Sequence, residues 1–399
     1  MDMAKPIIRF KGYQDDWEQR KFGEIVEKYE DPVETPTEGY TRLGIRSHAK
    51  GTFHSFVEKG KELETAKMFR VAADKFIVNI TFGWEHAVAI TDENDAGKLV
   101  SHRFPQYSFN AGMVPKFFRY LILDENFKHH LELSSPGGAG RNRVLKLSDM
   151  LEYKMNFPSE AEQKKIAAYF DDLDHLITLH QRKCDETKRL KKYMLQKMFP
   201  QNGEKVPEIR FSGFTDDWEQ RKLGDLTEEL SEYATMASGL PLLTSSRSGL
   251  MYQSDFRDRK TTTSDETLFS IVPKGSCTYR HMSDDDIFHL NINVLEKGLV
   301  SREYPVFISS ENNDLEFIIQ HINSSDRFRA FCKGQKKGGT RTRLYYKTLC
   351  EFEMMIPSIE EQKKISATLH SLDYLITLHQ RELENLQNIK KFMLGKMFV

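Results

Sequence analysis

Two glycine-rich basic segments contain the side chains of this chain best suited to contacting a polyanion. They read SSPGGAGRNR at residues 134–143 and CKGQKKGGTRTR at residues 332–343. Glycine lets the backbone approach a phosphate closely, and the planar guanidinium of arginine can pair with either phosphate or guanine. We therefore predict DNA contacts here, with a solvated loop carrying surface charges as the alternative. The predicted contacts are Arg141 aligned with Arg341, Arg143 aligned with Arg343, and Lys333, Lys336 and Lys337.

Two other segments place basic and amide side chains next to predicted strands. They are YTRLGIRSHAKGTFH (residues 40–54) and TSSRSGLMYQSDFRDRK (residues 244–260), and their polar side chains are expected in loops near strand ends. Arginine, lysine and glutamine match the hydrogen-bonding groups of base edges in the major groove. For any single one of them, a surface charge without a ligand is an equally good interpretation. The candidates are Arg42, Arg46, His48, Lys50, Arg247, Gln253, Arg257 and Arg259.

The sequence lacks the residue patterns that catalysis would need. A methyltransferase would require a glycine-rich cofactor loop after a strand and an Asn-Pro-Pro-Phe or Asp-Pro-Pro-Tyr tetrapeptide, and neither occurs. Nuclease-like triplets are common in a chain with 29% charged residues, and Asp149 is too close to Glu152 for a metal-binding hairpin. His129 and His130 have no matching ligand cluster, and the cysteines form no CxxC pair. The sequence thus predicts a protein that is not an enzyme, with no cofactor and no metal site.

An internal repeat reveals the elements that must position these loops. The segment FKGYQDDWEQRK (residues 10–21) recurs as FSGFTDDWEQRK (residues 211–222), with nine of twelve residues identical. A longer segment, residues 158–199, recurs at residues 357–398 with 24 of 42 positions identical. Between these blocks the two copies differ almost completely. The chain is therefore a tandem repeat in the order variable, constant, variable, constant.

The two long constant segments are predicted to be helices. Each begins with Pro-Ser, which places Ser159 or Ser358 as the N-cap. The narrow apolar stripe that follows has 3-4 spacing, which indicates an antiparallel coiled coil between the two copies. His180 and His379 lie on this stripe, where a polar residue can fix the helix register; a pH switch or a partner ligand is the alternative. The predicted interface consists of Ile166, Phe170, Leu173, Ile177, His180, Ile365, Leu369, Leu372, Ile376 and His379.

The variable regions are predicted to contain both helices and strands. ADKFIVNITFGW, GKLVSHRFPQY and GLVSREYPVFIS are rich in β-branched and aromatic residues interrupted by Gly and Pro, which is typical of strands. Residues 114–133 and 314–332 have helical spacing. We expect an α+β fold: two mixed α/β domains separated by two long helices that form the antiparallel coiled coil, in a pseudo-two-fold tandem repeat. The predicted boundaries are 1–157 and 200–356 for the domains, and 158–199 and 357–399 for the helices.

Length and composition limit the class of protein. At 399 residues the chain suits two domains plus connecting helices. No apolar run reaches the roughly 18 residues of a membrane span, and MDMAKPIIRF does not resemble a secretion signal. We therefore expect a cytoplasmic protein with no membrane partner. The 58 Lys and Arg residues nearly balance the 59 Asp and Glu residues, so any DNA binding must come from local patches or from partner subunits.

A chain in which two divergent α/β domains alternate with two near-identical helices resembles the specificity (S) subunit of type I restriction-modification systems. The resemblance covers essentially the whole chain. It is carried by DDWEQRKFGE and DDWEQRKLGD, by the GLVS-type strand, and by the helix starts NFPSEAEQKKI and MIPSIEEQKKI. It implies a non-catalytic subunit whose variable regions are target recognition domains, each reading one half of a split double-stranded DNA sequence. It also implies that the helices set the gap and dock two methyltransferase subunits, with restriction subunits in the full complex.

Physical reasoning on the repeat agrees with that expectation. Two readers that differ in sequence should read different half-sites, and a rigid helix pair can hold them about one turn of DNA, roughly 34 Å, apart. The repeated DDWEQRK would then join each domain to the helices, with Trp17 and Trp218 as packing anchors on a strand that runs into a turn and a short helix. The alternative is an adaptor scaffold whose two domains bind proteins across a coiled-coil spacer. The neutral charge favours the scaffold, and the basic glycine-rich segments in both copies favour DNA.

Overall fold

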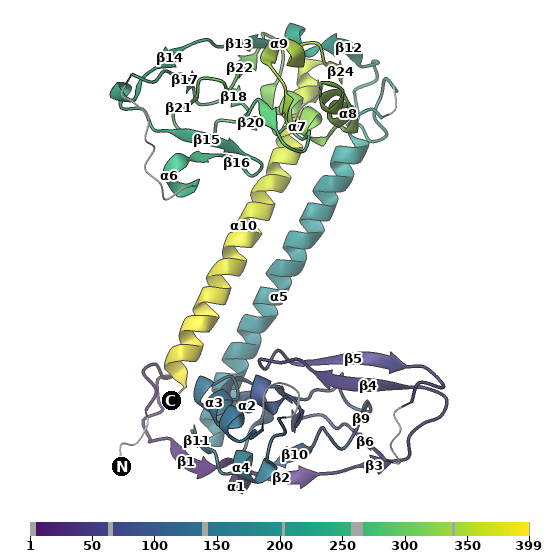
Figure 1. Cartoon of the computed structure of the whole chain (residues 1–399), viewed down its shortest axis with the longest axis vertical. Coiled ribbons are helices and arrows are strands. Elements are labelled where there is room, and N and C mark those ends of the chain that lie inside the picture. Colours follow the sequence, from purple (N-terminus) through teal and green to yellow (C-terminus); the bar gives the residue numbers. More distant parts are fainter. Residues whose placement is uncertain are drawn as a thin grey trace. The chain divides into compact units, whose positions relative to one another are not determined.

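The chain folds into two units, each of which combines a mixed α/β region with part of two long helices (Figure 1). The structure is a computed structural model that describes residues 5–62, 67–137, 143–201, 204–256, 266–336 and 340–398. The first unit contains residues 1–180 and 381–399, and the second contains residues 181–380. Because the border between the units falls inside the long helices, the four predicted domain boundaries stay predictions.

The long helices are α5 (Glu160–Lys197) and α10 (Ile359–Met397), with 38 and 39 residues. They begin directly after the serines predicted as N-caps. Ser358 Oγ accepts a hydrogen bond from Glu361 N at 3.4 Å, which satisfies one of the free backbone amides at the start of α10. Within the described residues, neither helix is apolar enough over a sufficient length to cross a bilayer.

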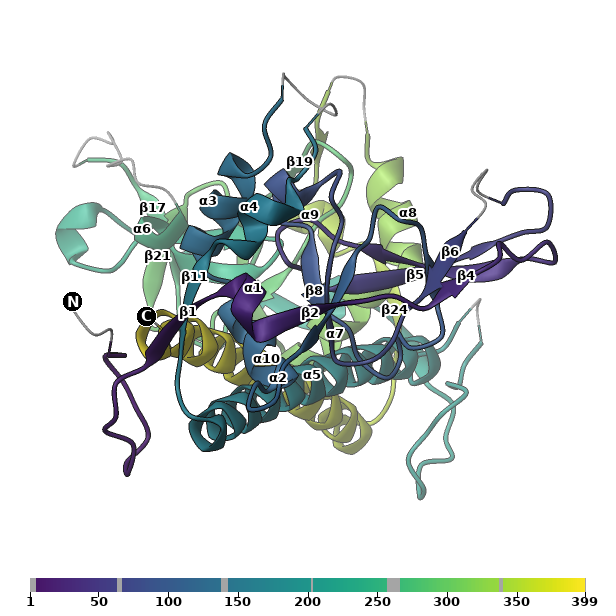
Figure 2. The same cartoon turned by 90° about the horizontal axis from the view of Figure 1, so that it is seen from below.

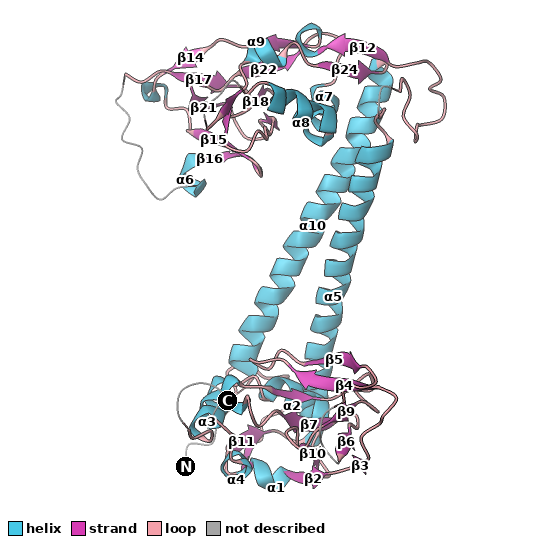
Figure 3. Cartoon of the chain, turned by 45° about the vertical axis from the view of Figure 1, so that its right-hand side comes forward, coloured by secondary structure: helices cyan, strands magenta, loops and turns pink. Residues whose placement is uncertain are grey.

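Ion pairs within each unit show that α5 and α10 pack antiparallel (Figure 3). In the first unit, Lys390 of α10 pairs with Asp174 of α5. In the second unit, Lys191 of α5 lies 2.6 Å from Asp373 of α10. Within the first unit, Phe170 of α5 also lies 5.8 Å from Phe398 just after α10, so the residue number in α10 falls as that in α5 rises, which confirms the predicted antiparallel pairing.

The first unit contains a four-stranded antiparallel sheet, a five-stranded sheet and a pair of strands near the long helices. The four-stranded sheet has the order β2 (Val26–Tyr29), β10 (Gln106–Phe109), β7 (Lys75–Val78) and β8 (Val88–Ile90). The five-stranded sheet has the order β3 (Pro32–Val33), β6 (Met68–Arg70), β9 (Leu99–Val100), β4 (Tyr40–Ile45) and β5 (Thr52–Val57). The pair is β1 (Glu18–Lys21) with β11 (Lys154–Phe157), next to the short helices α1 (Phe22–Ile25) and α4 (Leu147–Leu151) (Figure 2).

The second unit repeats the four-stranded sheet in the same strand order. Its strands are β13 (Thr227–Glu229), β22 (Val306–Ser309), β18 (Cys277–Thr278) and β20 (Asn291–Ile292). A three-stranded sheet holds β14 (Tyr233–Ala234), β17 (Phe269–Val272) and β21 (Gly298–Ser301). The remaining pairs are β12 (Glu219–Lys222) with β24 (Glu353–Ile356), β15 (Leu243–Ser246) with β16 (Gly249–Tyr252), and β19 (Met282–Ser283) with β23 (Thr342–Arg343). The strands predicted from ADKFIVNITFGW, GKLVSHRFPQY and GLVSREYPVFIS are thereby confirmed as β7, β9, β10, β21 and β22.

The two helical stretches predicted at residues 114–133 and 314–332 are each divided into two helices. The first pair is α2 (Pro115–Leu121) and α3 (Glu125–Leu133), and the second is α7 (Leu315–Ser324) and α8 (Asp326–Gly334). The breaks fall at Asp124 and Ser325, whose side chains accept hydrogen bonds from Phe127 N at 3.1 Å and Phe328 N at 3.2 Å. A side chain that caps a new helix takes the place of the backbone bond that would have continued the old one.

The hydrophobic core of each unit extends from its sheet and helices onto the long helices. Phe170 of α5 packs against Tyr120 of α2, with ring centroids 4.9 Å apart. The stripe residues nearest the start of each long helix are buried, and those nearer the middle are half-buried. The buried members are Ile166, Phe170, Leu173, Ile365, Leu369 and Leu372, and the half-buried members are Ile177, His180, Ile376 and His379.

The repeated DDWEQRK segment joins each α/β region to the helices, as predicted. Its last four residues form β1 and β12, which run into α1 and into the short helix η2 (Leu223–Asp225). Trp17 is buried and meets Phe398, just after α10, edge-on at 6.3 Å. Trp218 meets Phe199, just after α5, in the same way at 6.4 Å. The tryptophans are therefore packing anchors, and each contacts the end of a long helix.

A buried ion pair strengthens each joint and was not foreseen from the sequence. Arg9 donates from Nε and Nη2 to the two oxygens of Glu162, both at 2.7 Å. Arg210 and Glu361 repeat the arrangement at 2.8 Å. Hydrogen bonding to the carboxylate raises the pKa of Arg9 and of Arg210 above the ordinary value. The Glu of the EQKKI helix start is thus the partner of an arginine that precedes DDWEQRK.

Candidate nucleic-acid interface

In the second unit, separate segments meet around an acidic triplet, residues 284–286, which follows β19. Arg247, in the turn of the β15–β16 hairpin, forms an ion pair with Asp285. Arg341 donates from Nε to Asp284 Oδ1 at 2.7 Å. Lys336, just after α8, lies 3.6 Å from Asp286. Three of the predicted DNA contacts are therefore brought together on one short segment.

Backbone pairing fixes the segment that carries the triplet. Met282 of β19 lies opposite Arg343 of β23, and Leu344 N donates to His281 O at 2.8 Å. Ser283 Oγ donates to Asp285 Oδ1 at 2.9 Å. This hydrogen bond, together with that from Arg247, lowers the pKa of Asp285 below its ordinary value. Asp285 is therefore ionised at neutral pH and the ion pair is formed.

A cleft of about 520 Å³ lies beside the triplet. Its lining carries both charge signs, because Arg247 and Arg280 line it together with acidic side chains such as Asp284 and Glu303. Burial lowers the pKa of His281, another lining residue, so its imidazole is neutral at pH 7. A neutral imidazole can donate one hydrogen bond and accept another. The cleft thus offers the donors and acceptors that base edges require, in addition to cations for phosphate.

In the first unit, the predicted contacts Arg46, His48 and Lys50 lie exposed on the turn between β4 and β5. This turn is attached to the short helix η1 (Gly83–Glu85), because His48 N donates to Glu85 O at 2.8 Å. Arg46 folds back over the ring of Phe53 on β5, at 5.3 Å from the centroid, and donates to the backbone carbonyl of Thr52 at the start of β5. The turn is therefore a fixed basic projection.

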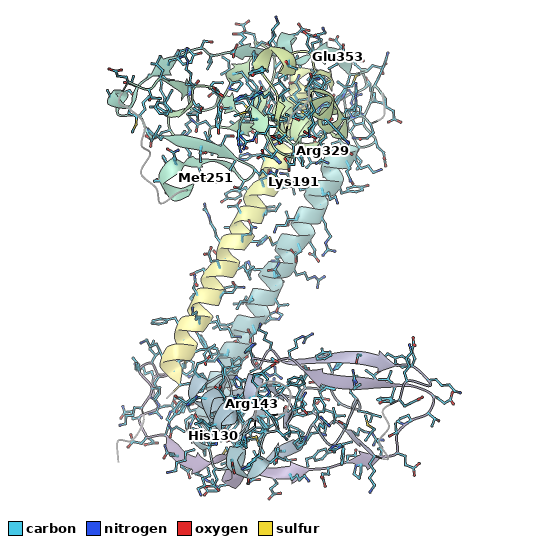
Figure 4. All side chains as sticks on the ribbon, viewed as in Figure 1. His130, Arg143, Lys191, Met251, Arg329 and Glu353 are labelled. Carbon is cyan, nitrogen blue, oxygen red and sulfur yellow. The ribbon has the colours of Figure 1, made fainter. Side chains whose placement is uncertain are left out.

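Arg143, labelled in Figure 4, contacts η1 through Trp84. Its guanidinium stacks over the ring of Trp84 at 5.6 Å, and Nη1 lies 3.8 Å from Glu132. Such cation–π contacts hold an arginine in place while leaving its N–H groups available for a ligand. The basic turn and the glycine-rich segment of the first unit are thus connected through η1, as those of the second unit are connected through the triplet.

Equivalent backbone contacts show that the two clusters occupy the same place in the fold. η1 lies between β7 and β8, and the triplet lies between β18 and β20, which hold the same sheet positions. Leu145 N donates to Ile80 O at 2.9 Å, which matches the bond between Leu344 and His281. Counting back two residues from each leucine places Arg143 opposite Thr342. The alignment of Arg143 with Arg343 is therefore wrong by one residue, because the two loops differ in length.

Some predicted residues are not part of these clusters. Arg42 lies within β4 opposite Ser55, so its prediction as a loop residue is wrong. Gln253 begins the short helix α6 (Gln253–Phe256), and Lys333 is exposed on the last turn of α8. Four other predicted residues lie outside the described residues: Arg141, Lys337, Arg257 and Arg259.

Sequence reasoning missed Trp84, Glu85 and the acidic triplet. These residues belong to connections between strands that reach the basic loops only in the folded chain. The run of three aspartates after Ser283 was the one visible signal in the sequence. In the part of the chain that the structure describes, no group of three or more His, Cys, Asp or Glu side chains is arranged to hold a metal ion.

Comparison with known proteins supports the sequence resemblance. The model of the type I restriction modification DNA specificity domain matches residues 14–189 and 287–388. A relative from Methanocaldococcus jannaschii, named as the specificity subunit of the type I restriction enzyme MjaX, is 22% identical over 409 residues, which cover 94% of this chain and 91% of the relative.

The fold is also that of a solved structure. The S subunit of a type I restriction-modification system from M. genitalium aligns over 99% of both chains with a TM-score of 0.58 and 13% identity. The HsdS subunit from Thermoanaerobacter tengcongensis aligns over 96% of both chains with a TM-score of 0.45 and 17% identity. Because the family model matches well over half of the residues, the chain belongs to the type I restriction-modification specificity subunits, the non-catalytic DNA-recognition subunits of these systems.

Proposed function

We propose that each unit reads one half of a bipartite, asymmetric double-stranded DNA target, with α5 and α10 setting the distance between the halves. The supporting observation is that equivalent places in the two units carry different polar side chains on the same backbone framework. In the first unit these are Arg46 over Phe53 and Arg143 over Trp84, and in the second they are Arg247 and Arg341 beside aspartates. Readers with different side chains at equivalent places should select different bases.

The chemistry of these side chains fits major-groove reading combined with phosphate contact. Arg143, Arg247 and Arg341 are partly or fully exposed, and each keeps N–H groups beyond its present contact that could reach the O6 and N7 acceptors of guanine. His48 and Lys50 project from a fixed turn and could neutralise phosphates. We infer that the turn and the glycine-rich segment of each unit enter the same groove.

We also propose that the long helices dock two methyltransferase subunits, with restriction subunits added in the full complex. Exposed apolar side chains on α5 and α10 repeat at equivalent positions, and such residues are typical of protein interfaces. In the first unit, the ion pair of Asp174 with Lys390 brings the exposed apolar residues of α5 and those of α10 to the same height along the two helices. The exposed set there is Leu176, Ile389 and Phe392, and the equivalent set in the second unit is Leu375, Leu190 and Tyr193. Two equivalent surfaces fit two copies of one partner, acting on DNA in the cytoplasm.

Methylation mapping tests the DNA-reading proposal. The subunit is expressed with its methyltransferase partner, and the methylated motif is read from the modified DNA. We expect a split, asymmetric motif, whereas a continuous palindrome would refute the proposal. Arg143→Ala should relax only one half of the motif and Arg247→Ala only the other, with the loss of each guanine contact costing about 1–3 kcal/mol of discrimination. Lys297→Ala, which removes an exposed cation paired with Glu232, serves as the control and should leave the motif unchanged.

A protein-binding scaffold remains the second candidate because the formal net charge is only −1. A titration of random duplex DNA at several salt concentrations separates the two, with and without the methyltransferase subunits. A logarithm of the DNA-binding constant that falls linearly with the logarithm of the salt concentration supports the DNA-reading function. Absence of binding in both conditions would favour the scaffold.

A further inference from the structure

The acidic triplet neutralises basic side chains that come from distant parts of the second unit. Arg247 belongs to a hairpin turn, Lys336 follows α8, and Arg341 precedes β23. Each is paired with a different member of residues 284–286. A fourth contact, from Thr342 Oγ1 to Asp286, attaches the triplet to β23 itself. Arg247, Lys336 and Arg341 of the proposed DNA surface thus already have anionic partners in the free chain.

The stability of the fold does not account for these pairs. The side chains of Arg247 and Asp285 are 65% and 42% exposed, and those of Arg341 and Asp284 are 52% and 63% exposed. Pairs so exposed contribute little to folding and are screened by salt. They can therefore be exchanged for other anions at low cost, and phosphate is the anion that DNA supplies.

The triplet is nevertheless held in a fixed place. Asp286 has a left-handed backbone with φ of 63°, and Ile287 N donates to Ser283 Oγ at 3.1 Å. Ser283 Oγ also donates to Asp285, and this hydrogen bond keeps the pKa of Asp285 below its ordinary value. A mobile acidic loop would move away from approaching DNA, but this one stays beside the cations. Any duplex that docks here must compete with the carboxylates and also faces their repulsion.

We propose that residues 284–286 are specificity determinants that compete with DNA phosphate for Arg247, Arg341 and Lys336, and so weaken binding of non-target DNA by the second unit. This inference rests on the proposed DNA-reading function. Non-target DNA offers these cations mainly phosphate, which the carboxylates already replace. In a target complex, Arg247 and Arg341 can reach base edges with the N–H groups that their aspartate contacts leave available, so these ion pairs need not be broken and target binding loses less. Specificity is a ratio of affinities, so lowering the weaker one increases it.

Among the described residues, an acidic triplet paired with basic side chains occurs at this place only in the second unit. Its place in the first unit is taken by η1, where Arg143 stacks on Trp84. There the arginine is held by an aromatic face, and one carboxylate, Glu132, lies 3.8 Å away. Removing the triplet should therefore change discrimination at the half-site read by the second unit and leave the other half-site unaffected.

The test uses the subunit assembled with its methyltransferase partners and the triple variant Asp284→Asn, Asp285→Asn and Asp286→Asn. Asparagine keeps the size and hydrogen-bonding oxygen of aspartate and tolerates the left-handed backbone at residue 286. Binding is measured over a salt series for the target and for a duplex in which the second unit's half-site is scrambled. We expect non-target affinity to rise roughly tenfold, with a salt slope steeper by about 0.9 for each freed cation that reaches a phosphate. Target affinity should rise less, so that the ratio falls.

A matched control removes the same charge from the same unit by Glu228→Gln, Glu229→Gln and Glu232→Gln, all exposed residues near β13. An equal rise in this control would overturn the proposal, because net charge would then explain the effect. A fall in target affinity without a non-target gain would also overturn it, since the aspartates would then orient the arginines. The double variant Arg247→Ala and Arg341→Ala tests the premise separately: unchanged binding of both duplexes would refute the DNA contacts themselves.

Discussion

The joint between Arg210 and Glu361 allows a quantitative prediction about how each unit is held together. The side chain of Glu361 is only 1% exposed and that of Arg210 is 15% exposed. Arg210→Met keeps the apolar stem of the side chain but removes the guanidinium. The carboxylate of Glu361 is then left buried without its two charge-assisted hydrogen bonds.

The expected cost follows from that burial. Breaking a buried ion pair by removing one partner costs roughly 3–5 kcal/mol, because the other charge stays buried. Arg210 keeps some contact with water, so we expect the lower end, about 3 kcal/mol. The double variant Arg210→Met with Glu361→Met removes both charges and should recover most of this loss. The exposed pair Lys222 with Glu351 provides the comparison, since its side chains are 50% and 62% exposed and Lys222→Met should have a far smaller effect.

Hydrogen exchange followed by mass spectrometry resolves the effect by unit, which a single melting curve would not. In Arg210→Met, slowly exchanging amides of the second unit should lose about two orders of magnitude of protection, because 1.4 kcal/mol corresponds to a factor of ten. Arg9→Met should do the same in the first unit through Glu162. The reasoning is refuted if Arg210→Met matches Lys222→Met, or if it weakens both units equally.

Two further predictions concern the second unit. Burial lowers the pKa of His321 to about 3, whereas its pKa in the unfolded chain is about 6.5. The free energy of unfolding that depends on neutral His321 should therefore be fully present above pH 6.5. Below that pH it should fall by about 1.4 kcal/mol per pH unit as the pH drops toward 3. His321→Phe should therefore lose about 2 kcal/mol less than the parent between pH 6.5 and 5, measured by urea unfolding, and an unchanged pH slope would contradict this. For the helix pair, Lys191→Asp and Asp373→Lys should each destabilise the second unit by about 0.5–1 kcal/mol, and the double reversal should recover most of it; strictly additive losses in a double-mutant cycle would show that the pair is not coupled.

The sequence predicted the repeat architecture well because identical blocks impose identical local structure. In both copies DDWEQRK is followed by an apolar residue and Gly, which indicates a strand leading into a turn. The partner of Glu162 was harder to find, although Ile-Arg-Phe precedes DDWEQRK in both copies. Nothing in periodicity says that Arg9 meets a glutamate more than 150 residues later. That contact depends on how β1 and α5 are brought together by the fold.

The prediction of helix boundaries inside the variable regions was wrong for a local reason. Periodicity continues across Asp124 and across Ser325, because the helices on both sides face the same core. A capping side chain can end one helix and begin another without disturbing the apolar pattern. The capping potential of aspartate and serine was present in the sequence, and giving it more weight would have located both breaks.

The sequence predicted the basic residues of the candidate site but not the aromatic and acidic residues that hold them. Arginine and glycine can be recognised in a loop, but their partners come from connections between other strands. Arg143 and Arg341 are held in quite different ways, by an indole ring and by a carboxylate. The one-residue error in the alignment has the same origin, since only the backbone bonds of Leu145 and Leu344 show the true correspondence. The register role predicted for His180 and His379 stays a prediction.

The joints also explain why the constant segments remained alike while the variable regions diverged. Ile8 N donates to Lys396 O at 3.0 Å at the end of α10, and Ile209 N donates to Lys197 O at 2.8 Å at the end of α5. Each α/β region is therefore fastened to the start of the helix that follows it and to the end of the helix from the other copy. Each constant segment takes part in both units, because each helix contributes its start to one joint and its end to the other. A change in a recognition loop disturbs only its own unit, which leaves those loops free to differ.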